Sequence, residues 1–230
     1  MRRPDQNGPA GVSLAPERIA WRSRGYLPHV QTPNLVQHVI FRLVDSLPAT
    51  IRADIAKRPA DERGRVAEHA LDRGHGNRHL AHPQVAERVQ SALLAFDGAR
   101  YDLMVWCVMP NHVHVLVHTK PEYGLERVVH SWKSYTAKAA NRFLHRTGSF
   151  WATDYFDRFM RDDEHLERTA LYIEGNPVKA GLCDNAADWR FSSARQKRAG
   201  GTPAVLTPAP VPIQLRTAGV PPASFPRTDA

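Results

Sequence analysis

The chain has 230 residues, of which 42% are hydrophobic and 23% are charged. This composition fits one folded domain with terminal extensions and excludes a chain that is disordered throughout, because a domain of this size buries most of what its unfolded chain exposes. A formal net charge of +8 favours a polyanionic partner, nucleic acid first of all, but charge alone does not assign one.

The cysteines and the hydropathy bear on where the protein works. Only Cys107 and Cys183 are present, which is too few for a disulfide framework and lacks the CxxC spacing of a metal site. No apolar stretch is long enough to span a bilayer, and no apolar segment follows the arginines at the start of the chain. We therefore expect a cytoplasmic protein without membrane contacts.

The two ends of the chain differ in composition from its centre. Residues 1–20 are rich in proline, glycine and polar side chains, and residues 199–230 repeat proline with few large apolar side chains. We expect both tails to be disordered, because they offer little apolar surface to bury. The folded domain is expected between them, over 21–198.

The central range alternates between the two-residue period of strands and the 3.6-residue period of helices. Between the first strand and the first clear helix lies a charge-dense insertion, about 52–81, in which only a short helix near 66–71 is expected. Met109-Pro110-Asn111 separates two strand patterns and predicts a hairpin. In chain order, the predicted elements are strand 36–44, helix 85–94, strands 101–108 and 112–118, helix 122–146, strand 155–160, and helix 163–174, which ends before Asn176-Pro177.

This order of elements predicts a fold class. It is the βαββαβ pattern of the ferredoxin-like fold with one further helix at its C-terminal end. We expect an α+β protein whose antiparallel sheet has helices on one face and is open on the other. Because this fold hosts many activities, it assigns none by itself.

His112 and His114 are the first candidates for chemistry. They alternate with Val113 in a predicted strand, so both imidazoles point to the same side of the sheet, about 6–7 Å apart along the strand. Two such rings can bind one metal ion, although histidines on an open sheet face are common without one. His118 lies too far along the strand to join them, and Leu116 fills the place of the third histidine in a nucleotide-binding loop of alternating histidines.

A longer pattern around these histidines carries a family resemblance. The segment Met109-Pro110-Asn111-His112-Val113-His114-Val115-Leu116-Val117 closely resembles the HUH motif of REP-associated tyrosine transposases, relatives of the single-tyrosine transposases of bacterial insertion sequences. Further segments resemble motifs of that family in the same order: Gly25-Tyr26-Leu27-Pro28-His29, Trp132-Lys133-Ser134-Tyr135-Thr136, Phe150-Trp151 with Tyr155-Phe156-Asp157-Arg158, Tyr172-Ile173-Glu174-Gly175-Asn176-Pro177-Val178-Lys179-Ala180-Gly181-Leu182, and Trp189-Arg190-Phe191-Ser192-Ser193. The resemblance covers about 21–195 and makes 21–198 the expected catalytic domain.

The resemblance implies a chemistry for this domain. A tyrosine on the helix after the hairpin would attack a DNA phosphodiester and leave a 5′-phosphotyrosine and a free 3′-hydroxyl, and Tyr135 occupies that position. A phenol has a pKa near 10, so it needs help at neutral pH. A divalent ion, Mg²⁺ or Mn²⁺, on His112 and His114 would polarise the phosphate and stabilise the developing charge.

The helical spacing around Tyr135 is compatible with this role. Tyr135 lies at the edge of a predicted buried stripe, beside Lys138 and Arg142, where a phosphate could bind. The alternative is a boundary tyrosine that only extends its hydroxyl to water. Relatives commonly take a third metal ligand from about one turn beyond the tyrosine, but Ala139 stands there and cannot bind a metal, so the third ligand stays unassigned.

The expected partner is single-stranded DNA folded into hairpins or palindromic repeats, bound by a monomer or a homodimer. Trp132 is assigned to the core, whereas Trp151 could stack on bases or pack in the core. Basic residues expected near the DNA are Lys133, Lys138, Arg142, Arg146, Arg158, Arg161 and Lys179. Two alternatives remain: a catalytically silent hairpin-binding protein derived from a mobile element, and an unrelated metal hydrolase, for which the flanking hairpin offers no acidic base.

Overall fold

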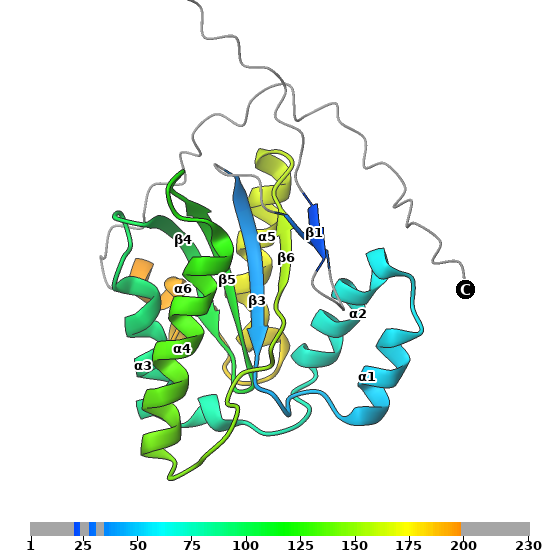
Figure 1. The fold of residues 1–230 in the computed structure, drawn as a ribbon. Coiled ribbons are helices and arrows are strands. Elements are labelled where there is room, and N and C mark those ends of the chain that lie inside the picture. Colours follow the sequence, from blue (N-terminus) through cyan, green and yellow to red (C-terminus); the bar gives the residue numbers. More distant parts are fainter. Residues whose placement is uncertain (1–20, 24–27, 31–34, 199–230) are drawn as a thin grey trace, which may run out of the picture.

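The computed structural model describes residues 21–23, 28–30 and 35–198 (Figure 1). The tails predicted to be disordered, 1–20 and 199–230, lie outside this part of the chain. No helix within the described ranges is long and apolar enough to cross a membrane.

A four-stranded antiparallel sheet forms the centre of the fold. Its strands are β3 (Val36–Arg42), β4 (Tyr101–Val108), β5 (His112–Thr119) and β6 (Phe156–Phe159). They lie in the order β4-β5-β3-β6, so the first and last strands of the sheet in the chain, β3 and β6, are neighbours. This is the ferredoxin-like order, and the βαββαβ pattern predicted from the sequence is confirmed.

One face of the sheet is covered by the two connecting helices, as predicted. These are α3 (Pro83–Leu94) and α4 (Leu125–Phe143), and Figure 1 shows α4 crossing in front of the sheet. The residues of β5 that alternate with its histidines point into this core: Val113, Val115 and Val117. Trp132 is buried there as predicted, and Trp151 also packs in this core, where its Nε1 donates to Thr136 Oγ1 at 2.9 Å. Of the two alternatives that the sequence left open for Trp151, the structure shows packing in the core.

The opposite face is not open, contrary to the prediction. The appended helix α5 (Asp163–Lys179) lies behind the sheet in Figure 1 and buries Leu166 and Ile173 against it. The charge-dense insertion forms a helical hairpin, α1 (Ala49–Ala56) and α2 (Ala60–Asp72), instead of one short helix. The hairpin has its own small core, which joins it to Ile40 of β3: Leu47, Ile55, Ala67, Ala70 and Leu71. This apolar stripe is narrow, and the charges between its members conceal it in the sequence.

Helix α5 continues through Pro177, although the sequence predicted an end before Asn176. Proline lacks the N–H that would bond the preceding turn, but the tertiary packing of α5 keeps the backbone helical as far as Lys179. Gly181, with a φ of 66°, then follows the end of the helix. Consequently Asn176 lies one helical turn after Tyr172, on the same side of α5.

Smaller elements complete the described structure. The strands β1 (Trp21–Ser23) and β2 (Pro28–Val30) form a separate antiparallel pair. His29 of β2 is buried against Asp154 and Asp157, which anchors this pair beside β6. The short helices are η1 (His79–Ala81), η2 (Ala186–Asp188) and α6 (Ser193–Arg198).

Candidate metal and nucleophile site

His112 and His114 lie side by side on β5, on the sheet face that α2 and α5 cover. The alternation in the sequence predicted this shared face. Both side chains are fully buried, and their Nε2 atoms are only 2.8 Å apart. Two imidazole nitrogens that face one point can bind a single metal ion there.

Asn111 fixes the ring of His112. Its Nδ2 donates to the carbonyl oxygens of His75 at 2.8 Å and of Leu71 at 3.4 Å, so its Oδ1 is left to accept. That oxygen lies 2.6 Å from His112 Nδ1, which therefore carries the proton. The lone pair of Nε2 remains available, and the ring is held in place by its other nitrogen.

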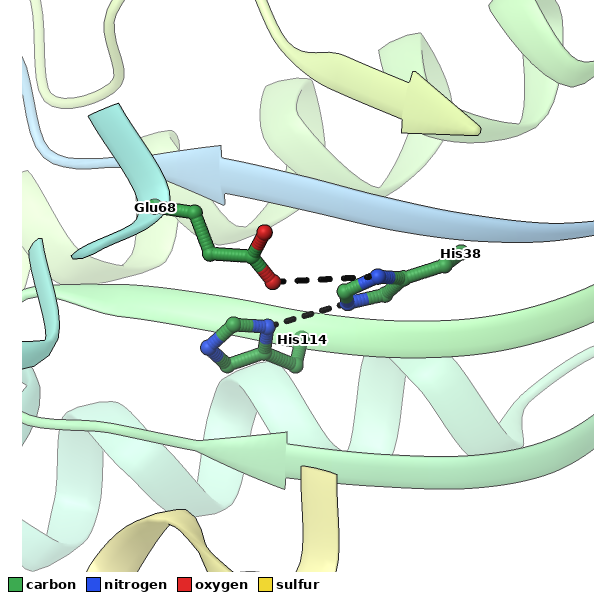
Figure 2. A group of neighbouring side chains, drawn as sticks. All are labelled: His38, Glu68 and His114. Carbon is green, nitrogen blue, oxygen red and sulfur yellow. Dashed lines mark hydrogen bonds and ion pairs between the residues drawn. The ribbon is translucent and has the colours of Figure 1, made fainter. Parts of the chain in front are cut away.

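A second series of contacts orients His114 (Figure 2). Its Nδ1 lies 3.0 Å from Nε2 of His38 on β3, and His38 Nδ1 lies 3.9 Å from Glu68 Oε1 on α2. Because the carboxylate can only accept, the arrangement favours a proton on Nδ1 of each ring, donated in the direction of Glu68. His114 Nε2 then presents its lone pair to the point that His112 Nε2 also faces.

Burial keeps the imidazoles of His112 and His38 neutral. It lowers the pKa of His112 to about 4, although the contact with Asp72 opposes this shift. Burial, reinforced by the neighbouring His114, also lowers the pKa of His38 well below its ordinary value. A neutral imidazole offers its lone pair to a metal ion without first losing a proton.

Asp72, the last residue of α2, lies between the histidines and Tyr172. Its Oδ1 is 3.4 Å from His112 Nε2 and 3.5 Å from His114 Nε2. Its Oδ2 accepts a hydrogen bond of 2.6 Å from the hydroxyl of Tyr172. Asp72 thus accepts from Tyr172 through one oxygen and faces both histidines with the other.

Tyr172 lies on α5 with its ring edge against His114, at 5.7 Å between the ring centres. Burial, followed by the charges of Glu68 and Asp72, raises the pKa of its hydroxyl well above the ordinary value. The group is therefore a protonated phenol at neutral pH, and it donates to Asp72. Lys179, two turns further along α5, places its Nζ 5.4 Å from the centre of the same ring.

Asn176 reaches the histidines from one turn further along α5. Its side chain is buried, with Nδ2 3.0 Å from His114 Nε2, and its Oδ1 has no hydrogen-bond partner. The oxygen and nitrogen of an amide have nearly the same shape, so half a turn of this group brings the oxygen to His114. Asn176 thus has the position and the chemistry of the third ligand that Ala139 could not supply.

Unpaired polar atoms gather around this point, which tests whether a metal ion fits. Within the described ranges, the buried side-chain atoms without a hydrogen-bond partner include Asp72 Oδ1, Asn176 Oδ1 and Glu68 Oε1. Each such oxygen costs on the order of 1–3 kcal/mol. Ligand atoms of Asp72, His112 and His114 all lie within 4.8 Å of one another. A divalent cation among them would satisfy the first two oxygens, so the residues present fit such an ion.

Tyr135 lies on the other side of the sheet. It is 56% exposed on α4, and α4 packs on the valine face of β5, whereas the histidines point to the opposite face. Within one chain the sheet separates Tyr135 from His112 and His114, so the structure does not bring the predicted nucleophile to the predicted metal ligands. The alternative interpretation, a boundary tyrosine with its hydroxyl in water, describes its position.

The basic residues predicted to bind DNA divide between the two faces. Arg158 and Lys179 line a cavity of about 380 Å³ whose wall includes Asp72 and Tyr172. Basic residues that were not predicted line it too: Arg65, His69, His165 and Arg168. The remaining predicted residues do not line this cavity: Lys133, Lys138, Arg142 and Arg146, on or just after α4, and Arg161, after β6. One of them, Lys133, donates to the carbonyl oxygen of Thr153, and burial lowers its pKa to about 8.

Sequence reasoning missed Tyr172, Asn176 and Asp72. A signal existed for the first two, because they stand four residues apart in a segment that carries the family resemblance. The predicted end of the helix before Asn176 concealed that spacing. No comparable signal marked Asp72, since it lies in a segment that reads as a solvated, charged insertion.

Comparison with known proteins agrees with this architecture. The family model described as IS200-like transposase matches residues 77–176, a range that includes both histidines, Tyr172 and Asn176. Over this range, which carries the paired histidines, the chain is similar to the IS200-like transposases.

Individual proteins are also similar to this chain. The chain is 28% identical over 105 residues to a Haemophilus influenzae protein and 27% identical over 103 residues to one of Escherichia coli K12, both named as REP-associated tyrosine transposases. These matches cover 40% and 44% of this chain, and the chain spans 58% and 59% of the length of these relatives. A solved REP-associated tyrosine transposase bound to a REP hairpin shares the fold, with a TM-score of 0.52 at 15% identity over 88% of this chain and 97% of that one. The resemblance to REP-associated tyrosine transposases is confirmed.

Proposed function

We propose that this protein cleaves and rejoins single-stranded DNA, with Tyr172 as the nucleophile and a divalent metal ion at His112 and His114. One observation carries the proposal: the carboxylate that accepts the hydrogen bond of Tyr172 also lies within 3.5 Å of both histidine Nε2 atoms. Nucleophile and ion would then share one pocket of one chain, within a catalytic domain of residues 21–198. Tyr172 replaces Tyr135 in the chemistry that the sequence predicted.

The reaction exchanges one phosphoester bond for another. The phenolic oxygen of Tyr172 forms a bond to phosphorus, and the bond between phosphorus and the 3′ oxygen of the preceding nucleotide breaks. The phenolic proton ends on that 3′ oxygen, which leaves a 5′-phosphotyrosine and a free 3′-hydroxyl. Because the phosphoester bond is conserved, attack by another 3′-hydroxyl reverses the step and rejoins DNA without ATP.

The side chains of the pocket suit Mn²⁺ or Mg²⁺. His112 and His114 would hold the ion through Nε2, and Asn176 would offer its amide oxygen. When bound, such an ion polarises the non-bridging oxygens of the scissile phosphate and stabilises the charge that develops there. Imidazoles alone favour later transition metals, whereas oxygen donors favour the harder ions, so the mixed set supports this choice.

The cavity beside Tyr172 is lined by positively charged side chains that could bind a DNA strand. Arg158, Arg168 and Lys179 line it and would pair with backbone phosphates, releasing their counterions. A single tyrosine forms one covalent link at a time, which suits the cutting of one strand. We extend hairpin recognition to this chain because the solved relative is bound to a REP hairpin.

The test is to detect covalent protein–DNA adducts on a denaturing gel, using a labelled single-stranded hairpin and Mn²⁺. We expect adducts with the wild type, a loss of at least roughly 10³-fold in Tyr172→Phe, and wild-type behaviour in the matched control Tyr135→Phe. Hairpin affinity should stay nearly unchanged in both variants, because each loses only a hydroxyl.

Each other outcome has a definite meaning. Adducts that persist in Tyr172→Phe and vanish in Tyr135→Phe would return the nucleophile to α4. Tight hairpin binding by the wild type without any adduct would instead identify a silent hairpin-binding protein. An unstructured strand and a perfect duplex of equal length serve as substrate controls, and equal cleavage of all three would refute the preference for hairpins.

A further inference from the structure

We propose that Asp72 is a further catalytic residue, which binds the divalent ion through Oδ1 and holds the Tyr172 hydroxyl through Oδ2. The inference rests on the proposed function and extends it to α2. This helix ends at Asp72 and precedes residues 77–176, the part of the chain that the transposase family model matches. The active site would thus include an element outside that shared range.

The two oxygens of the Asp72 carboxylate have different surroundings. Oδ2 accepts the hydrogen bond of Tyr172 at 2.6 Å. Oδ1 is buried without a hydrogen-bond partner, 3.4 and 3.5 Å from the Nε2 atoms of His112 and His114. The contacts of both rings through Nδ1 leave lone pairs, not N–H groups, directed at this place. A cation bound at this place would satisfy the carboxylate oxygen and both lone pairs together.

Helix α2 is anchored so that its carboxylates face the histidines. Glu68 stands one turn before Asp72 on the same side of the helix, and its Oε1 lies 3.9 Å from His38 Nδ1. The other ring nitrogen of His38, Nε2, lies 3.0 Å from His114 Nδ1 (Figure 2). Leu71, fully buried in the core that includes Ile40, holds this side of α2 against the sheet. One helix therefore places both carboxylates beside the histidines.

The turn after α2 holds the end of the helix close to the hairpin that carries His112. Asn111 Nδ2 donates to the carbonyl oxygens of Leu71 and His75, on either side of Asp72. Gly76 has a φ of 71°, and a Cβ at this position would clash with the backbone of Asp45 and Ser46. The close approach of this turn to the chain after β3 thus requires glycine, and it places Asp72 beside the histidines.

The carboxylate of Asp72 also supplies a negative charge, which the other proposed ligands lack. Two imidazoles and an amide carry no charge, so an ionised Asp72 would be the one negative ligand among them. A carboxylate oxygen is a hard ligand, so its presence favours Mn²⁺ and Mg²⁺ over later transition metals. Because one oxygen holds the ion and the other holds the phenol, a single carboxylate would set the separation between ion and nucleophile.

The first test measures Mn²⁺ binding to the full chain, using electron paramagnetic resonance to count free Mn²⁺. We expect the nearly isosteric Asp72→Asn to bind Mn²⁺ at least about tenfold more weakly. Asp54→Asn removes an exposed carboxylate from α1 and is the matched control, with wild-type affinity. Tyr172→Phe should also retain wild-type Mn²⁺ affinity, because it removes no ligand.

The second test identifies direct coordination. Asp72→Cys places a thiolate at the proposed ligand position, and thiolates select soft ions. With Cd²⁺ we expect a thiolate-to-metal charge-transfer band in the ultraviolet, with one Cd²⁺ per chain. The wild type, with Cys107 and Cys183, and an Asp54→Cys variant should lack it. A residue that only supported the fold would not produce this band.

The outcomes separate this inference from the proposed function. Wild-type Mn²⁺ affinity in Asp72→Asn, together with no band in Asp72→Cys, overturns the assignment of Asp72 and leaves a Tyr172 adduct unaffected. Adducts that persist in Tyr172→Phe overturn the proposed function, while the two metal measurements still decide whether Asp72 is a ligand.

Discussion

Helices α4 and α5 cover opposite faces of one sheet, and each carries a tyrosine beside basic residues. Tyr135 of α4 is followed four residues later by Ala139, and Tyr172 of α5 is followed four residues later by Asn176. Only α5 packs on the face to which His112 and His114 point. The place of a helix against the sheet, and not its own sequence pattern, therefore decides whether its tyrosine meets the histidines.

The residues one turn after each tyrosine should differ most in their effect on metal binding. We expect Asn176→Ala to weaken Mn²⁺ binding by roughly 10–100-fold, because a proposed ligand is removed, and to slow adduct formation accordingly. Ala139→Asn should change neither quantity, since it adds an amide on the wrong side of the sheet. Isothermal titration with Mn²⁺ and the adduct gel check both. Equal affinities in Asn176→Ala and the wild type would remove Asn176 from the ligand set.

The basic residues of the two helices should also differ, by a smaller amount, in their contribution to DNA binding. The double variant Arg168→Ala/Lys179→Ala should weaken hairpin binding and reduce the slope of log affinity against log salt by roughly 1.4, because each phosphate of single-stranded DNA that is no longer neutralised lowers the slope by about 0.7. Lys138→Ala/Arg142→Ala on α4 is the matched control and should keep the wild-type slope. Fluorescence anisotropy over a range of salt concentrations measures the slopes. Equal reductions in both variants would mean that DNA binds to both faces.

Two buried histidines, His112 and His29, differ in their charge state. Burial keeps His112 neutral, whereas at His29 the hydrogen bonds and charges of Asp154 and Asp157 outweigh burial and raise the pKa to about 9. Because the folded pKa exceeds the unfolded value of 6.5, this stabilisation is fully present below about pH 6.5 and is lost as the pH rises through about 9.

Asp157→Asn therefore should lower the free energy of unfolding at neutral pH, by roughly 1–3 kcal/mol. The difference from the wild type should shrink above pH 9, where His29 is neutral in both proteins. Urea unfolding at pH 7 and at pH 10 measures it. A difference that stays constant between the two would show that the charge on His29 contributes nothing.

Local features were predictable because they depend on neighbours in the chain. The alternation of His112 and His114 with valines is a property of one strand, and it correctly placed both rings on one face. The order of strands and helices followed from periodicity in the same way and led to the ferredoxin-like topology. The motifs of the hairpin indicated the family for a similar reason, since they are contiguous.

Two local rules failed where tertiary packing opposed them. Proline is unfavourable inside a helix, so the sequence predicted that α5 ends before Asn176. In the structure the packed helix continues through Pro177. The insertion appeared solvated because charges separate its few apolar residues, yet Leu71 and its neighbours dock α2 on Ile40. Both failures fell on elements that form the candidate site.

The fold class, the family resemblance and the pair of histidines on one strand face were predictable from the order of residues alone. Which helix covers that face depends on tertiary packing, and this packing is why Tyr172, Asn176 and Asp72 surround the histidines while Tyr135 does not. Residues 72, 114 and 172 lie far apart in the chain, and each helix has an amphipathic pattern that either sheet face would satisfy. Their meeting depends on the packing of α2 and α5, which no local period encodes.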